Sequence, residues 1–141
     1  MLASRAAEGR FDRLGEPLAR HLQRVARAVP PEARAVALLH ESLHHGSASV
    51  GALEFAGLSV TEIAALRLLT RAPGESYELH ILTIAHAPGE EGRLARLVAV
   101  ADIDDHLAHA PRGQAASDAP PYLWARRHLD IGLKRTAAQH P

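Results

Sequence analysis

Apolar residues recur at the spacing of α-helices along most of the chain, and the period-two alternation of a β-strand is nearly absent. The first helical pattern begins after Pro17, which suits the first turn of a helix, and ends at the sequence VPPE. The second begins at Pro31 and continues through the sequence HESLHH at residues 40–45, with Gly46 as its C-cap. These patterns predict an all-α fold.

Capping residues mark further helices. A short helix is predicted within SVGALEFAG, and Ser59 with Glu62 has the spacing of a capping box before the next one. Ser76 is placed to cap a helix that a Pro-Gly pair closes at residues 88–89, and a longer helix covers roughly residues 93–108. Residues 111–121 are rich in Gly, Ser, Asp and Pro and are predicted to form a loop, and residues 122–136 form the last helix.

The length and charge of the chain narrow its class. With 141 residues it fits a single domain covering residues 1–141. Lysine plus arginine equals aspartate plus glutamate at 16 each, so no basic excess attracts nucleic acid or an anionic membrane. Cysteine is absent, and no apolar run reaches the roughly 20 residues that cross a bilayer. We expect a cytoplasmic protein with neither nucleic acid nor membrane as partner, and its oligomeric state does not follow from the sequence.

Histidine is unusually frequent, at ten residues, and it is the commonest metal-binding side chain. Residues 40–44 match the His-Glu-x-x-His motif of zinc peptidases. In that interpretation His40 and His44 bind zinc, Glu41 acts as the base, and a downstream carboxylate is the third ligand. The motif is short, however, and such enzymes commonly bind peptides at the edge of a sheet, for which no strand is predicted. A zinc peptidase is therefore the least favoured alternative.

Four segments in chain order carry a second pattern. LGEPLARHLQRVA resembles G-x-P-Y-x-x-H-x-x-x-V-A, and ALLHE resembles ALLHD. FAGLSVTEIAALRLLTR followed by GESY resembles the stretch between the central and last ligands of the same pattern, and VAVADIDDHL resembles VKLADLxDNL. Residues 9–108 thus resemble the HD superfamily of metal-dependent phosphohydrolases, in particular its small single-domain branch related to RelA/SpoT-type alarmone hydrolases.

This resemblance implies an HD-domain-like helical bundle that binds one divalent ion. The implied metal ligands are His21, His40, Glu41 and Asp102. Mixed nitrogen and oxygen ligands suit a first-row ion, with Mn²⁺ as the leading candidate and Fe²⁺ or Zn²⁺ as alternatives. The implied substrate is a phosphorylated nucleotide, such as an alarmone, or a related phosphoester, attacked by a metal-activated water. The spacing i, i+3 and i+4 also places Asp102, Asp105 and His106 on one helix face.

The sequence departs from the family pattern at this site. Glu41 stands where the family has aspartate, and its extra methylene moves the carboxylate by about 1.5 Å, a bond length. His44 and His45 occupy the positions of a Glu-Asp pair that positions or deprotonates the attacking water, and histidine can act as a general base. The remaining candidates for contacts to phosphate or base are Arg10, Arg13 and His106.

These departures leave a second function open. A catalytically degenerate module would keep the fold and a metal or nucleotide pocket but lack turnover, and Ala99 in place of the family's lysine is consistent with it. The histidines also have structural interpretations, as core or surface residues or, at 44–45, as cations near a helix C-terminus. Glu41 can equally be a solvated helix residue. Asp102 lies among apolar neighbours, where an unpaired carboxylate would be costly, and this favours a role in a site.

Overall fold

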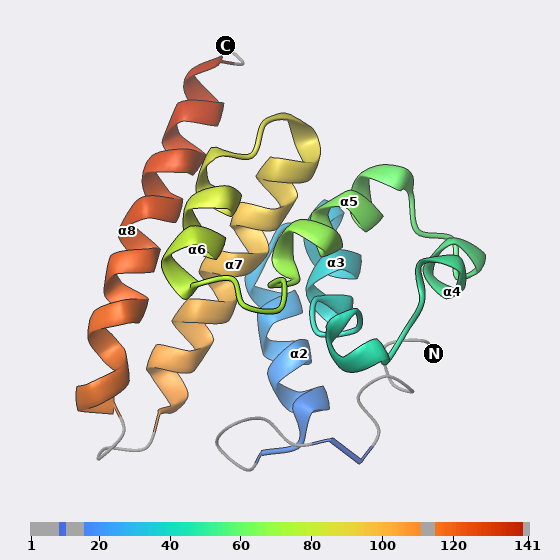
Figure 1. The fold of residues 1–141 in the computed structure, drawn as a ribbon, viewed down its shortest axis with the longest axis horizontal. Coiled ribbons are helices and arrows are strands. Elements are labelled where there is room, and N and C mark those ends of the chain that lie inside the picture. The colour runs from blue at the N-terminus through green and yellow to red at the C-terminus, as the bar shows by residue number, and fades with distance from the viewer. Residues whose placement is uncertain (1–8, 11–15, 111–114, 140–141) are drawn as a thin grey trace.

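The computed structural model describes residues 9–10, 16–110 and 115–139, and no β-strand occurs within these ranges (Figure 1). The helices in chain order are α2 (Leu18–Ala28), α3 (Arg34–Leu39), α4 (Val50–Phe55), α5 (Val60–Leu69), α6 (Tyr77–His86), α7 (Gly89–His109) and α8 (Ala115–Gln139). Two short 3₁₀ turns, η1 (Pro31–Ala33) and η2 (His44–Gly46), flank α3. The predicted all-α fold is confirmed.

Helix α7 is the centre of the bundle. It contacts α2, α3, α5, α6 and α8, and Figure 1 shows α8 on one side of it and α2 with α3 on the other. Val98 of α7 is fully buried in one core with Val25 of α2, Leu66 of α5, Ile84 of α6 and Leu129 of α8. Each such side chain contributes about 1.5–3 kcal/mol by leaving water. The apolar stripes of five helices therefore hold α7 in place, and with it any side chain that α7 carries.

The predicted caps are present. Ser59 Oγ accepts a hydrogen bond from the backbone N–H of Glu62 at 3.1 Å, and the Glu62 carboxylate accepts one from the Ser59 N–H at 2.8 Å. Ser76 Oγ accepts from the N–H of Leu79 at 3.1 Å at the start of α6. Within the described part of the chain, no helix is both long and apolar enough to cross a membrane.

The prediction that HESLHH belongs to a helix is wrong. Helix α3 ends at Leu39, and the chain continues through turns into η2. The i→i+3 bonds from the N–H of Ser42 to Leu39 O (2.8 Å) and from the N–H of His44 to Glu41 O (3.2 Å) tighten the backbone here. The imidazole of His40 also competes for the end of the helix, because its Nδ1 lies 2.7 Å from Ala37 O.

Two other boundaries also differ from the prediction. Helix α7 begins at Gly89, four residues before the expected start, and α8 begins at Ala115, so residues 115–121 are not a loop. Residues 111–114 lie outside the described ranges. Pro120 and Pro121 fall in the second turn of α8. Proline φ, about −65°, fits a helix, and the missing N–H groups remove two bonds near its start. Packing of α8 on α6 and α7 outweighs that loss.

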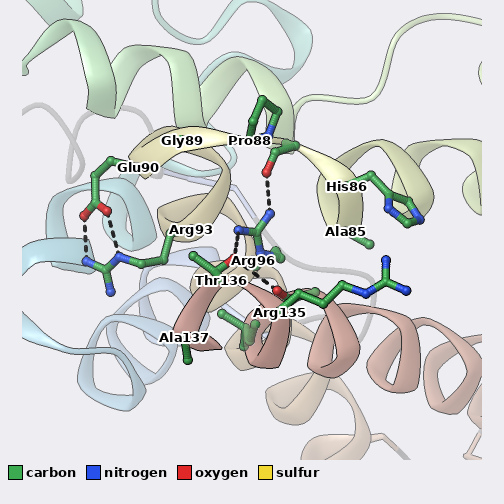
Figure 2. A pocket seen from close by; sticks show the side chains of 13 residues that line it. Ala85, His86, Pro88, Gly89, Glu90, Arg93, Arg96, Arg135, Thr136 and Ala137 are labelled. Carbon is green, nitrogen blue, oxygen red and sulfur yellow. Dashed lines mark hydrogen bonds and ion pairs between the residues drawn. The ribbon is translucent and has the colours of Figure 1, made fainter. Parts of the chain in front are cut away.

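A buried arginine joins three helices beside the C-terminus of α6 (Figure 2). Arg96 of α7 is only 2% exposed, and its guanidinium donates to Ala87 O at 2.6 Å and Ile84 O at 3.2 Å, beside the C-terminus of α6. It also donates to Thr136 Oγ1 of α8 at 2.7 Å. Gly132 permits this close approach, since a Cβ there would lie 2.6 Å from Ala85 O. Arg96 therefore satisfies terminal carbonyls and fastens α8 to the bundle.

Candidate metal centre

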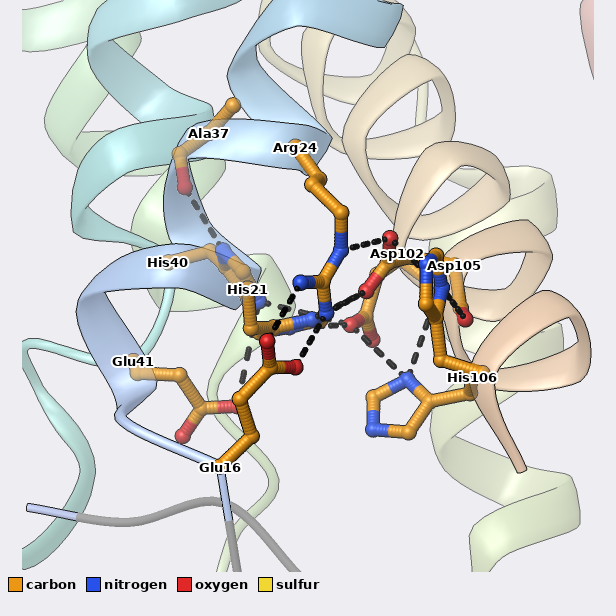
Figure 3. A network of polar contacts seen from close by, with 10 residues as sticks. Glu16, His21, Arg24, Ala37, His40, Glu41, Asp102, Asp105 and His106 are labelled. Carbon is orange, nitrogen blue, oxygen red and sulfur yellow. Dashed lines mark hydrogen bonds and ion pairs between the residues drawn. The ribbon is translucent and has the colours of Figure 1, made fainter. Parts of the chain in front are cut away.

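The ring of His21 lies between two carboxylates of α7 (Figure 3). His21 is buried on α2, with Nε2 3.0 Å from Asp102 Oδ1 and Nδ1 2.8 Å from Asp105 Oδ2. Burial opposes charge on Asp105, but hydrogen bonds from Arg24 and His21 outweigh it and lower the pKa of that carboxyl. An ionised carboxylate accepts hydrogen bonds only, so the Nδ1 of His21 carries a proton. In the neutral ring, the Nε2 lone pair then faces Asp102.

His40 approaches the same aspartate from the end of α3. Its Nδ1 lies 2.7 Å from the carbonyl oxygen of Ala37, which can only accept, so Nδ1 is again protonated. Its Nε2 faces Asp102 Oδ1 at 3.5 Å. Burial disfavours the charged imidazole, yet the adjacent carboxylate of Asp102 and the charge of Glu41 outweigh burial and raise the pKa of His40 to about 9.

Asp102 Oδ1 is the point where the imidazoles meet. Besides His21 Nε2 and His40 Nε2, the Nδ1 of His106 lies 3.1 Å from it. Burial would raise the pKa of this carboxyl, but His106, His21 and His40 together hold the pKa well below its ordinary value. The site therefore holds one ionised carboxylate among three histidine rings.

The geometry of this cluster fits a divalent cation. Two ligands that each lie about 2.1 Å from an ion are about 3 to 3.5 Å apart, which matches the separations from Asp102 Oδ1 to Nε2 of His21 and Nε2 of His40. The Nδ1 of His106 lies 2.9 Å from the backbone oxygen of Asp102 and donates to it. The Nε2 atoms of His21 and His40 and Oδ1 of Asp102 are buried, and none makes a hydrogen bond of acceptable geometry. Buried polar atoms without partners call for a missing group. One ligand atom each from His21, Asp102 and His106 lies within 4.8 Å of the others, a group that could hold a metal ion.

Of the four metal ligands that the resemblance implies, two belong to this three-residue group and two lie beside it. His21 and Asp102 belong to it, and His40 reaches Asp102. Glu41 is half-buried, with Oε1 3.8 Å from His40 Nε2, and among the described residues the three-residue group does not include it. The place of a metal site is therefore supported, whereas the individual ligand assignments stay predictions. His106, expected to contact substrate, is the added member.

A cavity of about 500 Å³ opens onto the cluster. Besides the four histidine and aspartate side chains, Glu41 and His44 line it, and so does Arg10. The Arg10 guanidinium donates to Ser47 Oγ, which holds it beside η2. Arg13 lies outside the described residues, and the side chain of His45 is not described either, so their predicted roles stay predictions.

Several residues of the cavity were not assigned to the site from the sequence. Arg71 and His80 add further basic groups to its wall. Tyr122 of α8 stacks on the ring of His106, with centroids 5.6 Å apart and an angle of 22° between the rings, and Tyr77 meets Tyr122 edge-on at 6.3 Å. Tyr122, the first residue of the predicted last helix, therefore supplies part of the cavity wall.

A second set of polar contacts joins Arg24 to the carboxylates of Asp105 and Glu16, next to His21. Arg24 Nε donates to Asp105 Oδ1 at 2.7 Å, and Arg24 Nη2 donates to Asp105 Oδ2 at 3.0 Å. The same guanidinium donates to both oxygens of Glu16, at 3.0 and 2.9 Å. The only sequence signal for this network is spacing: Arg24 follows His21 by three residues, and Asp105 follows Asp102 by three, so each pair shares a helix face.

Comparison with known proteins adds no further assignment. No protein-family model matches the sequence. A search of curated proteins also finds no match. The functional interpretation therefore depends on the residues of the cluster and on the cavity that they line.

Proposed function

We propose that this chain is a metal-dependent phosphohydrolase of the HD type, acting on a phosphorylated nucleotide such as an alarmone or on a related phosphoester. The observation that carries the proposal is the meeting of His21, His40 and His106 around the Asp102 carboxylate, with unsatisfied buried atoms, inside one cavity. These residues come from three separate parts of the chain, so their meeting is not a consequence of sequence proximity.

The donor set suits a first-row divalent ion, Mn²⁺ first and otherwise Fe²⁺ or Zn²⁺. His21, His40 and Asp102 would hold it, with His106 or Glu41 completing the set. When bound, such an ion lowers the pKa of a coordinated water and polarises a phosphoryl oxygen. His44 lines the same cavity and is the described candidate for accepting a proton from the attacking water.

The remaining cavity walls fit the phosphate group and the base of a nucleotide. Arg10 and Arg71 line the cavity, and their guanidinium groups would orient a phosphate group. Tyr122 with His106 forms a stacked pair, and a flat base can pack on such aromatic surfaces. An acidic floor that holds a cation and basic walls that hold an anion are complementary to a metal-bound phosphoester.

A second candidate function is a metal- or nucleotide-binding module without turnover. Its support is the position of Glu41, which stands outside the three-residue group, together with histidines in place of a carboxylate pair at 44–45. A zinc peptidase has less support, because His40 and His44 lie on a helix end and a separate 3₁₀ turn rather than on successive turns of one helix.

Metal analysis with a matched pair of variants tests the proposal. Protein purified without a histidine tag is loaded with Mn²⁺, and bound metal and phosphate release from a panel including guanosine tetraphosphate are measured. Asp102→Ala should lose both. Asp104→Ala is the control: Asp104 is exposed on the same helix and pairs with Arg126 instead, at 2.9 Å. We expect Asp104→Ala to behave as wild type.

The outcomes separate the candidate functions. Full metal retention by Asp102→Ala would remove the ligand proposal. Metal binding by wild type with no phosphate released from any compound would leave the binding module. Loss of metal by His44→Ala, with Glu41→Gln retaining it, would favour the peptidase arrangement, in which Glu41 does not touch the ion.

A further inference from the structure

We propose that Asp105 is a positioning residue for the metal centre: it fixes the ring and tautomer of His21, and Arg24 with Glu16 holds Asp105 in place. This inference rests on the proposed function for its chemical purpose. The geometry on which it depends is independent of any substrate.

The first step of the argument is the double contact of His21. Its two ring nitrogens face two aspartates one turn apart on α7, Nε2 toward Asp102 at 3.0 Å and Nδ1 toward Asp105 at 2.8 Å. A ring held at both nitrogens has one orientation. With the proton of the neutral ring on Nδ1, Nε2 offers its lone pair toward the centre of the cluster. A metal-binding histidine typically donates its other N–H to a carboxylate in this way, which fixes the tautomer and makes the ligand more basic.

The second step concerns why Asp105 does not bind the ion itself. Both of its oxygens are already used: Oδ2 by His21 and Arg24, and Oδ1 by Arg24, with Nδ1 of His109 also 3.3 Å away. Rotation of the carboxylate toward the cavity would break several charge-assisted contacts. Asp102 and Asp105 therefore differ in role although they share a helix face.

The third step concerns how Arg24 and Glu16 hold Asp105 in place. The planar guanidinium of Arg24 makes paired hydrogen bonds to Asp105 on one edge and to Glu16 on another. Paired bonds of this kind fix direction as well as distance, which a lysine could not reproduce. Glu16 lies two residues before the start of α2, and Arg24 lies one turn beyond His21. These contacts therefore join the beginning of α2 to α7 beside the candidate metal centre.

A purely structural ion pair is the competing explanation, and the two make different predictions. A structural pair affects stability but leaves the His21 tautomer and the metal affinity of the folded protein unchanged. Asp105→Asn keeps the shape of the side chain but offers an amide N–H that can face His21 and select the other tautomer. Asp104→Asn makes the same change at the adjacent, exposed position and is the matched control.

The experiment measures two quantities on folded protein. Mn²⁺ affinity is measured by isothermal titration calorimetry, and the His21 tautomer is read from ¹⁵N shifts of the imidazole in metal-free protein. We expect Asp105→Asn to weaken Mn²⁺ binding by about 10- to 100-fold and to reduce the Nδ1–H tautomer, with Asp104→Asn unchanged. If Asp105→Asn does not fold, Arg24→Gln is measured instead, with the same two changes expected to a smaller degree.

Wild-type Mn²⁺ affinity and an unchanged His21 tautomer in folded Asp105→Asn would overturn the inference, as would a wild-type His21 with its proton on Nε2 alone. Failure of the proposed function looks different. A wild type that binds Mn²⁺ but releases no phosphate leaves this inference intact. A wild type that binds no Mn²⁺ removes the metal centre, and the tautomer measurement then decides alone whether Asp105 positions His21.

Discussion

Helix α7 carries Arg96, which is buried, and Asp102, which is half-buried, six residues apart, and the polar atoms of the two side chains are satisfied to different degrees. At Arg96, the donors of one guanidinium meet carbonyl and hydroxyl oxygens of α6 and α8, and only Nε lacks a partner (Figure 2). At Asp102, one carboxylate oxygen meets three imidazole nitrogens, and buried atoms on both sides lack hydrogen bonds (Figure 3). The first arrangement meets all its donors but one within the protein. The second leaves several buried atoms without a hydrogen bond, and it includes a group that could hold a metal ion.

The two sites differ in how far their hydrogen bonds are met within the protein. They also differ in burial, since Arg96 is 2% exposed and the side chain of Asp102 is 28% exposed. A complete set of donors and acceptors joins helices, and its loss should lower stability. A cluster whose buried carboxylate and imidazole atoms lack hydrogen bonds should respond to metal and to pH. Three predictions test this difference between Arg96 and the Asp102 cluster, and the one with the largest expected effect on stability comes first.

Arg96→Ala should have the largest effect on stability. It leaves Ile84 O, Ala87 O and the Thr136 hydroxyl without their donor at the junction of α6, α7 and α8, so we expect a loss of about 2–4 kcal/mol in the free energy of unfolding. Urea denaturation followed by circular dichroism measures this loss. Arg127→Ala, at an exposed position of α8, is the control and should stay within about 0.5 kcal/mol of wild type.

The Mn²⁺ affinity of folded Arg96→Ala should equal that of wild type, because the arginine makes no contact with the cluster around Asp102. A loss of tenfold or more, about 1.4 kcal/mol, would show that the two regions are coupled and would break the comparison.

Metal-free stability should depend on pH through the Asp102 cluster. The pKa of His40 is about 9 in the folded protein and about 6.5 in the unfolded chain, so its stabilisation is complete below about pH 6.5 and is lost as the pH rises through 9. The lowered pKa of Asp102 acts in the other direction: its stabilisation is present above about pH 4 and is lost as the pH falls further. The cluster therefore stabilises metal-free protein most between about pH 4 and 6.5.

Urea midpoints measured across this range for wild type and His40→Gln check the prediction. His40→Gln should flatten the decline on the alkaline side, and an unchanged decline would contradict it. Mn²⁺ should compete with the same proton, so its affinity should rise with pH toward about 9 in wild type.

Ser59→Ala should have the smallest effect and serves as a reference outside both regions. Loss of the capping box at the start of α5 should lower the free energy of unfolding by about 1 kcal/mol. Ser49→Ala removes a similar cap from the short peripheral helix α4 and should cost no more. Thermal denaturation measures both, and Mn²⁺ affinity should not change in either. A change in affinity would mean that general destabilisation reaches the site.

Much of the fold followed from local signals, and the exceptions have identifiable causes. The caps at Ser59 and Ser76 act through hydrogen bonds within three residues, so the sequence alone located the helices that they begin. The end of α3 was missed because a side chain, that of His40, takes the carbonyl that a continuing helix would use. The start of α8 was missed because packing on α6 and α7 outweighs a composition typical of loops.

The sequence by itself determined the all-α class and the helix starts at Ser59 and Ser76, since helical periodicity and caps are local. The family resemblance added His21, His40 and Asp102 as candidate ligands. Only the tertiary structure decided that these residues meet, that His106 joins them and that Asp105 lies behind His21 with Arg24. The contacts that do so join positions 84 and 81 residues apart, for His21 with Asp105 and Arg24 with Asp105. Such contacts depend on how α2 and α7 pack together in the core, and no local pattern in either segment specifies that arrangement.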